Sequence, residues 1–259
     1  MPRLSPDTVN SLHTVLKHTG DFALKHRHEA VVQYKPDKTP FTDLELYMET
    51  ILIDFLHQTF PDDQMITEEN GVLGIRSRNI WALDPIDGTK IFLNGLPTWC
   101  ISLGLIEDTT PSFGAIYMPV SGDLFWGGPG YGAWHNDSQL GKDQDLDFDH
   151  PLVFLGVPAN AQLHYDIRYP SARSFGSTAV HLAFLATGAA IGVLTRRINL
   201  WDIAGALPLR TETGVEVNFL SGKPLITAEH LDGKKFPEEL LAARPINIEK
   251  LRAVIVKKD

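Results

Sequence analysis

Cysteine is nearly absent from this sequence, since Cys100 is the single cysteine among 259 residues. One cysteine excludes a disulfide within the chain, and such usage is typical of a reducing compartment. No apolar segment approaches the roughly 20 residues that a membrane-spanning helix needs. The first residues, Met-Pro-Arg-Leu-Ser, lack the apolar core of a signal peptide. These absences predict a cytoplasmic protein with no membrane partner.

A strongly basic segment is also missing. The sequence has 23 lysines and arginines against 32 aspartates and glutamates, which gives a net charge of −9. Surfaces that bind nucleic acids are rich in lysine and arginine, so we expect no nucleic-acid polymer among the partners. An acidic protein that handles phosphate groups needs metal cations or local basic side chains to offset the repulsion.

Several catalytic motifs are absent as well. The ten histidines show no zinc-type spacing, and no Gly-x-Ser-x-Gly elbow marks a nucleophilic serine. The Gly-Gly-Pro-Gly segment at 127–130 is not followed by a P-loop helix start, so it is predicted to be a hairpin turn. His181 lies in an apolar helical stretch and is predicted to be a packed or partly exposed helix residue, not a ligand.

The residues that are present have the composition of an ordinary soluble globular protein, with 43% hydrophobic and 21% charged residues. Two capping signals, Ser5-Pro6-Asp7 and Thr42-Asp43-Leu44-Glu45, predict helices that run to about residues 25 and 60. Apolar runs and periodicity predict the other elements. The predicted strands are 30–34, 65–67, 80–83, 99–105, 113–117, 124–126, 131–136, 152–157 and 191–194. An acidic connection at 141–150, a helix at 179–187 capped by residues 176–178, a helix at 199–213, a hairpin at 215–227 and short helices within 238–256 complete the prediction.

The most informative stretch begins where the predicted strand 80–83 meets Asp84-Pro85. Proline fixes its own φ and disfavours the helical region for the residue before it, so the chain must turn there. Asp84 and Asp87 then lie on one turn, where both carboxylates can point at a common centre. Gly88 lets a ligand approach the backbone, and a helix that starts here would offer free N–H groups to an anion. Acids beside an anion site suggest a metal that holds a phosphate; the alternative is a plain surface turn.

Other acids stand at the starts and ends of predicted elements. Glu68-Glu69 follows the strand 65–67, and ligands in α/β proteins bind at strand ends. A solvated edge is the alternative, but the position just upstream of the second acid cluster favours a function. Taken alone, Asp43 and Asp202 are each explained as a cap or a first-turn acid favoured by the helix dipole.

Together, three motifs resemble the inositol monophosphatase family. They are Glu68-Glu69, Asp-Pro-Ile-Asp-Gly-Thr at 84–89 and Trp-Asp-Ile-Ala-Gly at 201–205, in this order. The order and spacing agree from the Thr42-Asp43 helix start to Gly214, and three motifs in order are far more specific than one.

This resemblance implies an α/β (α+β) protein with the layered αβαβα sugar-phosphatase fold. Residues 1–140 would form an N-terminal α+β half with most metal ligands, and residues 141–259 a C-terminal half that contributes Asp202. The implied activity is that of a magnesium-dependent, lithium-sensitive phosphomonoesterase, in which a metal-activated water attacks a small phosphorylated metabolite directly. Two or three Mg²⁺ ions are implied, with Mn²⁺ as a possible substitute, and a homodimer is expected.

The resemblance also assigns metal ligands. They are the side chains of Glu68, Asp84, Asp87 and Asp202 and the main-chain carbonyl of Ile86. Such oxygen ligands are those that Mg²⁺ prefers. Hydrolysis of a phosphate monoester needs on the order of 20 kcal/mol of catalysis, which two cations flanking the phosphate help to supply.

Catalytic and substrate-binding roles follow from the same resemblance. Glu68 and Thr89 match the pair that orients the attacking water, and Asp43 matches an acid of the outer metal and water network. The implied substrate-binding residues are Asp87, Gly88, Thr89, Ser177, Thr195 and Asp202.

The sequence departs from the family pattern near the leaving group. Thr195 stands where inositol-cleaving members carry a glutamate for the sugar hydroxyls, and Arg196 and Arg197 follow it. The arginines are predicted either to contact a second anionic group or to be exposed strand-end residues. Lys90 is similar to its counterpart in relatives that act on histidinol phosphate or 3′-phosphoadenosine 5′-phosphate. The family resemblance makes inositol monophosphate the first expectation, and these departures leave those two substrates as alternatives. A phosphate-ligand sensor or regulatory partner is the non-enzymatic alternative.

Overall fold

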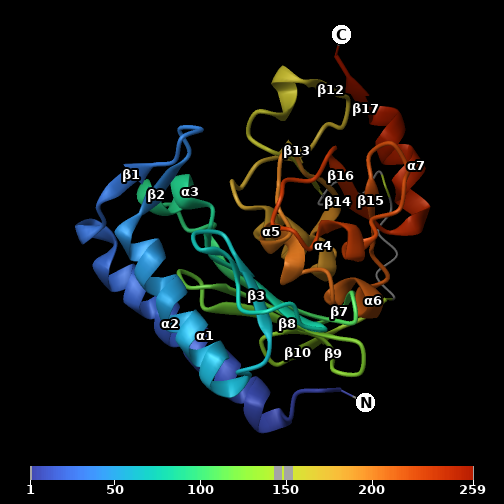
Figure 1. The fold of residues 1–259 in the computed structure, drawn as a ribbon. Helices are drawn as coiled ribbons and strands as arrows, with labels where there is room; N and C mark the ends of the chain where they lie inside the picture. Colours follow the sequence, from blue (N-terminus) through green and yellow to red (C-terminus); the bar gives the residue numbers. More distant parts are fainter. Residues whose placement is uncertain (1, 143–147, 149–153, 259) are drawn as a thin grey trace.

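Two long helices cover one face of the largest sheet in the computed structural model, which describes residues 2–142, 148 and 154–258 (Figure 1). Helix α1 spans Pro6–His26 and α2 spans Asp43–Thr59, which confirms both predicted helices. The hydroxyl of Ser5 accepts from the amide of Thr8 at the start of α1. Thr42 and Glu45 form the predicted capping box at the start of α2.

The largest sheet has eight strands in the order β10-β9-β8-β7-β6-β5-β3-β4. Its strands are β3 (Gln64–Thr67), β4 (Gly71–Leu73), β5 (Asn79–Asp87), β6 (Cys100–Glu107), β7 (Thr110–Met118), β8 (Asp123–Gly128), β9 (Gly132–His135) and β10 (Ser138–Leu140). Strands β3 and β5 run parallel, while the other described pairs in this sheet are antiparallel. The carboxyl ends of β3 and β5 therefore meet at one edge of the sheet.

A second, five-stranded sheet has the order β13-β11-β14-β16-β15. It comprises β11 (Phe154–Gly156), β13 (Ala172–Arg173), β14 (Ala190–Leu194), β15 (Glu216–Phe219) and β16 (Leu240–Ala243). Helices α4 (Thr178–Thr187), α5 (Trp201–Ala204) and α6 (Leu209–Thr213) lie between the two sheets, and α7 (Pro245–Val254) covers the far face (Figure 1). These layers confirm the predicted αβαβα fold.

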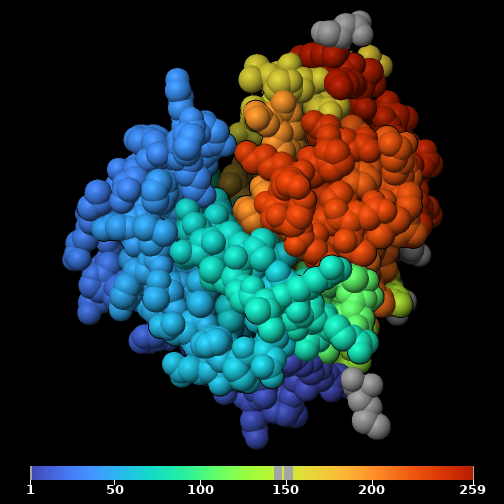
Figure 2. Space-filling view, in the orientation of Figure 1, coloured from blue at the N-terminus to red at the C-terminus, as the bar shows by residue number. Residues whose placement is uncertain are grey.

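The remaining elements are short. They are the hairpin of β1 (Val32–Tyr34) and β2 (Pro40–Thr42), the helix α3 (Thr89–Leu93), the pair β12 (Tyr165–Ile167) and β17 (Ile255–Lys257), and the 3₁₀ turns η1 (Arg27–Glu29), η2 (Ala161–Leu163) and η3 (Thr227–His230). Figure 2 shows a hollow on the surface between the segment that contains the β1–β2 hairpin and the C-terminal half of the chain.

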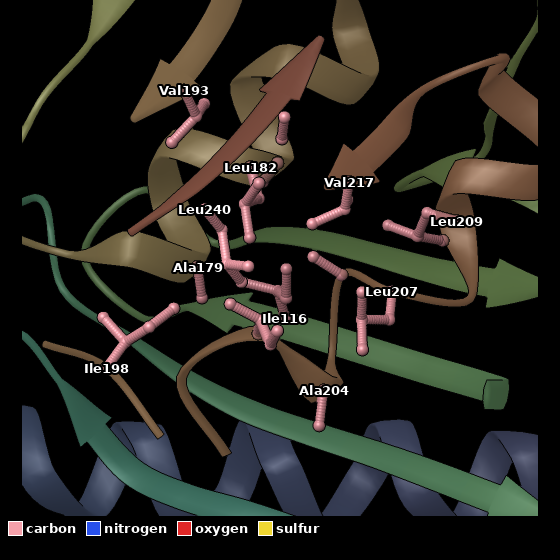
Figure 3. Close-up of a cluster of buried hydrophobic side chains, with 14 of the residues drawn as sticks. Ile116, Ala179, Leu182, Val193, Ile198, Ala204, Leu207, Leu209, Val217 and Leu240 are labelled. Atoms are coloured by element: carbon pink, nitrogen blue, oxygen red, sulfur yellow. The ribbon is translucent and has the colours of Figure 1, made fainter. Parts of the chain in front are cut away.

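The middle layer is locked by a large apolar core that both sheets share. Figure 3 shows Ile116 of β7, Leu182 of α4, Leu207 and Val217 pointing into this core. Helix α4 is apolar on nearly all sides, as expected of a helix buried between two layers. Because residues of both predicted halves build this core, the elements that carry the acids are held in fixed relative positions. A division at residue 140 stays a prediction.

Three predictions for the C-terminal part are wrong. Strand β15 pairs with β16, and the expected hairpin at 215–227 is reduced to a single bridge between Asn218 and Pro224. The segment 240–243, expected to be helical, is a fully buried strand because pairing inside the sheet overrides its local helix propensity. The predicted helix 199–213 is split into α5 and α6, with Pro208 as the N-cap of α6.

The predicted connection at 141–150 lies mostly outside the described residues, as do the first two residues of the predicted strand 152–157. No helix among the described residues is long and apolar enough to span a membrane.

Candidate metal and phosphate site

Three carboxylates from distant parts of the sequence meet at the edge where β3 and β5 end. Glu68 directly follows β3, Asp84 lies near the end of β5, and Asp202 lies in the first turn of α5. One oxygen from each lies within 4.8 Å of the others. Asp84 is buried, while Glu68 and Asp202 are half-buried. A divalent cation bound by carboxylate oxygens requires such a convergence.

Helix α5 reaches this position because it packs unusually close to the large sheet. A Cβ on Gly104 of β6 would lie 2.3 Å from the carbonyl oxygen of Ala204, and one on Gly114 of β7 would lie 2.2 Å from that of Gly205. The hydroxyl of Ser102 donates to the carbonyl oxygen of Trp201 at 3.0 Å. Because Gly104 and Gly114 have no side chains, the backbone beside Asp202 can pack directly on β6 and β7, and the hydrogen bond from Ser102 holds it there. Strand β6 is the neighbour of β5, which carries Asp84.

The predicted strand end at residue 83 is wrong, because β5 continues through Asp84 and Pro85 to Asp87. The pairing of β5 with β6 shifts register between Asp84 and Asp87, so the chain departs from the regular ladder there. Asp84 accepts a hydrogen bond from the amide of Ile86 at 2.9 Å. Gly88 has φ +103, a left-handed conformation that favours glycine, and α3 begins at the next residue. The carbonyl oxygen of Ile86 lies 3.5 Å from the hydroxyl of Thr89.

The turn that carries Glu68 is held by a buried carboxylate on α2. Glu49 is fully buried and accepts from the hydroxyl of Thr67 at 2.7 Å and from the amide of Glu69 at 3.0 Å. It also accepts from the backbone and side-chain nitrogens of Asn70 at 2.9 and 2.6 Å. Four donors converge on this one group, so Glu49 holds the side chain before Glu68 and the backbone after it.

A second carboxylate of α2 reaches the first residue of α3. The hydroxyl of Thr89 donates to Oε1 of Glu45 at 2.7 Å, while Oε2 of Glu45 caps α2 at Thr42. Glu45 is 1% exposed, and burial raises the pKa of its carboxyl to about 7. Asp43, the acid that was expected here, is exposed and accepts from the amide of Val31 at 2.8 Å. The sequence did not predict this contact of Glu45, because its position in the capping box already explains a glutamate there.

Asp87 connects the turn to the start of α4. Its Oδ2 accepts from the hydroxyl of Ser177 at 2.7 Å and from the amide of Ala179 at 2.6 Å. Ser177 in turn accepts from the amide of Val180 and so caps α4. Asp87 lies outside the group of three converging carboxylates found among the described residues. Its role as a metal ligand and that of Ser177 in substrate binding stay predictions.

Three aspartates of this site have raised pKa values, so binding of a cation would release protons from them. Burial raises the pKa of Asp84 and of Asp202 well above the usual value, and the charges of the neighbouring acids raise both further. Burial also raises the pKa of Asp87, to about 6. A set of carboxylate oxygens that repel one another in a buried site fits a hard divalent cation such as Mg²⁺.

A lysine lies against the outer acids. Lys35, which follows β1, places its ammonium 2.9 Å from Glu68 and 2.8 Å from Glu69. Burial disfavours the charge of Lys35, but the two carboxylates outweigh this effect and raise its pKa. The ammonium thus offsets part of the negative charge at the mouth of the site.

The sequence matches the model of the inositol monophosphatase family over residues 9–251. The chain belongs to the inositol monophosphatase family. It is 29% identical to the fructose-1,6-bisphosphatase/inositol-1-monophosphatase of Aquifex aeolicus, over 79% of this chain and 81% of that protein. It is 29% identical to human inositol monophosphatase 1, over 78% of each chain, and 27% identical to the Nus factor SuhB of Pasteurella multocida, over 86% of this chain and 81% of that protein.

Solved structures agree on the fold. A staphylococcal IMPase-I complexed with products superposes with a TM-score of 0.84 over 99% of this chain and 100% of that one, at 18% identity. Members of the inositol monophosphatase family are metal-dependent phosphatases that act on small phosphorylated substrates, and the acid cluster described above could bind such a metal. The relatives carry several different names, so membership establishes the class of chemistry and not the substrate.

In this member of the inositol monophosphatase family, two of the three residues considered for recognition of the leaving group, Thr195 and Arg196, contact the start of strand β16 or the residue before it. Thr195 is 3% exposed, and its amide and hydroxyl both bond to the backbone of Leu240, at 2.9 and 3.2 Å. Arg196 pairs with Glu239 at 3.4 Å. Arg197 is exposed with φ +56. The roles predicted for Thr195 and for the arginines in substrate binding stay predictions.

Proposed function

We propose that the protein is a Mg²⁺-dependent phosphomonoesterase that hydrolyses a small phosphorylated metabolite, with inositol monophosphate as the first candidate. The observation that carries the proposal is the convergence of Glu68, Asp84 and Asp202 within 4.8 Å beside the Thr89–Glu45 hydrogen bond. The first three supply ligands for a cation, and the pair supplies a route for a proton. A protein that only binds phosphate has no need of the second feature.

The ligands of the proposed cations are the carboxylates of Glu68, Asp84, Asp87 and Asp202 and the carbonyl oxygen of Ile86. Bound Mg²⁺ would lower the pKa of a water and offset the charge of the phosphate. The residues of the chain orient and fix these groups. Glu49 and the Gly104 contact support this role from outside the site, because they hold the Glu68 turn and α5 in place.

We propose that Thr89 and Glu45 together take up the proton that the attacking water loses. Because the Thr89 hydroxyl donates to Oε1 of Glu45, its oxygen is available to accept from a water molecule. As a water loses its proton to the oxygen of Thr89, Thr89 passes its own proton to Glu45. A carboxyl group with a pKa of about 7 can accept a proton near neutral pH and release it again afterwards. Glu68 is the alternative partner of Thr89, as implied by the family resemblance.

The leaving group would lie near Ser177 and the amides at the start of α4. Relatives with names that include inositol monophosphatase support inositol monophosphate as the first candidate. A phosphorylated metabolite with a second anionic group is the second candidate, because Arg197 offers an exposed cationic side chain, whereas the buried Thr195 has no carboxylate for sugar hydroxyls. The Aquifex relative, named as a fructose-1,6-bisphosphatase as well, supports this reading. Histidinol phosphate and 3′-phosphoadenosine 5′-phosphate belong to the same test.

The test is release of inorganic phosphate by the purified protein. A panel of inositol monophosphate, fructose 1,6-bisphosphate, histidinol phosphate and 3′-phosphoadenosine 5′-phosphate is compared with Mg²⁺, with Mn²⁺ and with EDTA. We expect metal-dependent release from at least one substrate and its loss in Asp84→Asn. Asp62→Asn, which changes an exposed acid two residues before β3, is the matched control. No release from any substrate with either metal would overturn the proposal in favour of a sensor or regulatory partner.

Three further properties belong to this proposal and come from the family resemblance. They are inhibition by lithium, assembly as a homodimer and a cytoplasmic location. Adding LiCl to the phosphate-release assay tests the first, and sedimentation of the purified protein tests the second.

A further inference from the structure

A C-terminal segment beside the acid cluster is tied to the turn that carries Asp202. The side-chain amide of Asn199 donates to the carbonyl oxygen of Gly233 at 2.9 Å, and the amide of Phe236 donates to that of Ile198 at 2.9 Å. The backbone amide of Asn199 donates to Asp202 at 2.6 Å. The segment 233–236 is therefore anchored next to one of the proposed metal ligands.

On the other side of the cluster, the turn of the β1–β2 hairpin has a defined conformation. The amide of Lys35 donates to the carbonyl oxygen of Thr39 at 2.9 Å, and Asp37 accepts from the amide of Thr39 at 3.1 Å. The ammonium of Lys35 contacts Glu68 and Glu69. This turn therefore carries one side chain into the site and presents another, Asp37, towards the C-terminal half.

One ion pair bridges these two segments. The ammonium of Lys235 lies 3.2 Å from Oδ2 of Asp37, although the residues are 198 positions apart in the sequence. The bridge runs between the hairpin segment and the C-terminal half, the two regions that flank the surface hollow in Figure 2.

We propose that Lys235 is a positioning residue whose ion pair with Asp37 latches the β1–β2 hairpin across the mouth of the acid cluster. With the latch closed, Lys35 is held against Glu68 and Glu69. With the latch open, the hairpin moves away, and cations or substrates enter and leave more easily. The inference rests on the proposed function only for the identity of the cations or substrates that pass the hairpin.

The strength of the contact suits a latch that opens often. The side chains of Lys235 and Asp37 are 50% and 52% exposed. Exposed ion pairs contribute little to stability and are screened by salt, so we expect hairpin opening to rise only about two- to fivefold when the pair is removed. A permanent closure would need a buried contact.

The test compares hydrogen exchange of residues 32–42, measured by mass spectrometry, in the full-length protein and its variants. We expect Lys235→Gln and Asp37→Asn each to speed exchange in this segment about two- to fivefold, and Lys235→Arg to leave it unchanged. Combining the first two should add nothing, because either one already removes the pair. Lys234→Gln is the matched control, since Lys234 pairs with Asp232 inside its own loop.

A second readout uses Mn²⁺ alone, followed by its release to excess EDTA. We expect release to be about two- to fivefold faster in Lys235→Gln and at the parent rate in Lys235→Arg and Lys234→Gln. Unchanged hairpin exchange in Lys235→Gln, additive effects of the two substitutions, or an equal effect of Lys234→Gln would each overturn the latch. These measurements need no phosphatase activity, so a failed substrate panel and a failed latch give different results.

Discussion

The hydroxyl of Thr89 donates to Oε1 of Glu45 over 2.7 Å, although the two residues are 44 positions apart. This contact joins the capped start of α2 to the first residue of α3. It brings a buried carboxyl with a pKa of about 7 into direct contact with the hydroxyl of Thr89.

We predict that Glu45→Gln lowers kcat by at least about 100-fold, because an amide cannot accept the proton that Thr89 passes on. Metal affinity should change much less, since Glu45 is not among the converging carboxylates. Steady-state kinetics with a Mg²⁺ titration measure both quantities.

The comparison with Asp43→Asn decides between the two acids at the start of α2. Asp43 is exposed and only tethers the amide of Val31, so its substitution should lower kcat at least about tenfold less than Glu45→Gln does. Equal losses in the two variants would mean that Glu45 has no special role beside Asp43, which the family resemblance assigns to the outer metal and water network.

Much of this site could be predicted from the sequence because its signals are local. Gly88 favours the left-handed conformation that precedes the predicted helix start, and α3 begins at Thr89; the strand itself ends at Asp87, four residues later than predicted. Glu68 could be placed because β3 and β5 run side by side in parallel.

Other features depend on contacts that no local pattern encodes. The capping box at Thr42 predicted α2 but concealed the second oxygen of Glu45, which bonds 44 residues away. The run Leu240–Ala243 has the local character of a helix, yet its neighbours in the second sheet make it a strand. Glycine inside a strand is unfavourable locally, so the sequence gives no reason for Gly104 and Gly114. The structure gives one, because the backbone at Ala204 and Gly205 packs directly on them.

We predict that Glu49→Gln lowers metal affinity about 10- to 100-fold while the protein stays folded. An amide presents an NH₂ group to donors that now converge on a carboxylate, so the turn that carries Glu68 loosens. Isothermal titration with Mn²⁺ measures the affinity, and circular dichroism verifies the fold. Thr67→Ser, which keeps the hydroxyl donor to Glu49, is the control and should bind within about twofold of the parent. Parent-like affinity in a folded Glu49→Gln protein would remove this support role.

We predict that Gly104→Ala destabilises the protein by about 2–4 kcal/mol, because the new methyl group would overlap the carbonyl oxygen of Ala204. The helix α5 must move outward to make room, so the same variant should bind metal more weakly through the displaced Asp202. Urea denaturation measures the loss. Gly122→Ala is the control: its Cβ meets open space, and only its φ of +74 is strained, which costs about 1 kcal/mol. A smaller loss for Gly104→Ala than for Gly122→Ala would mean that α5 can shift freely.

The last prediction concerns pH and the stabilisation that Mg²⁺ provides. In the metal-free protein, burial holds the pKa of Asp84, Asp87 and Asp202 above the unfolded values. The native state therefore binds more protons than the unfolded state from about pH 4 upwards, and these groups lower the free energy of unfolding as the pH rises through their native pKa values.

Bound Mg²⁺ reverses this dependence, because it needs the three carboxylates ionised and competes with their protons. The rise in Tm that saturating Mg²⁺ produces over EDTA should therefore be larger at pH 7.5 than at pH 5.5. His13 and His181 act in the opposite direction, since burial lowers the pKa of both to about 4 and the unfolded state takes up their protons first as the pH falls below about 6.5. Their effect is the same with and without metal, so the difference in Tm at each pH removes it. Thermal scans at both pH values measure this difference, which should nearly vanish in Asp84→Asn. A Mg²⁺ effect that is equal at the two pH values would show that these acids are not the cation's ligands.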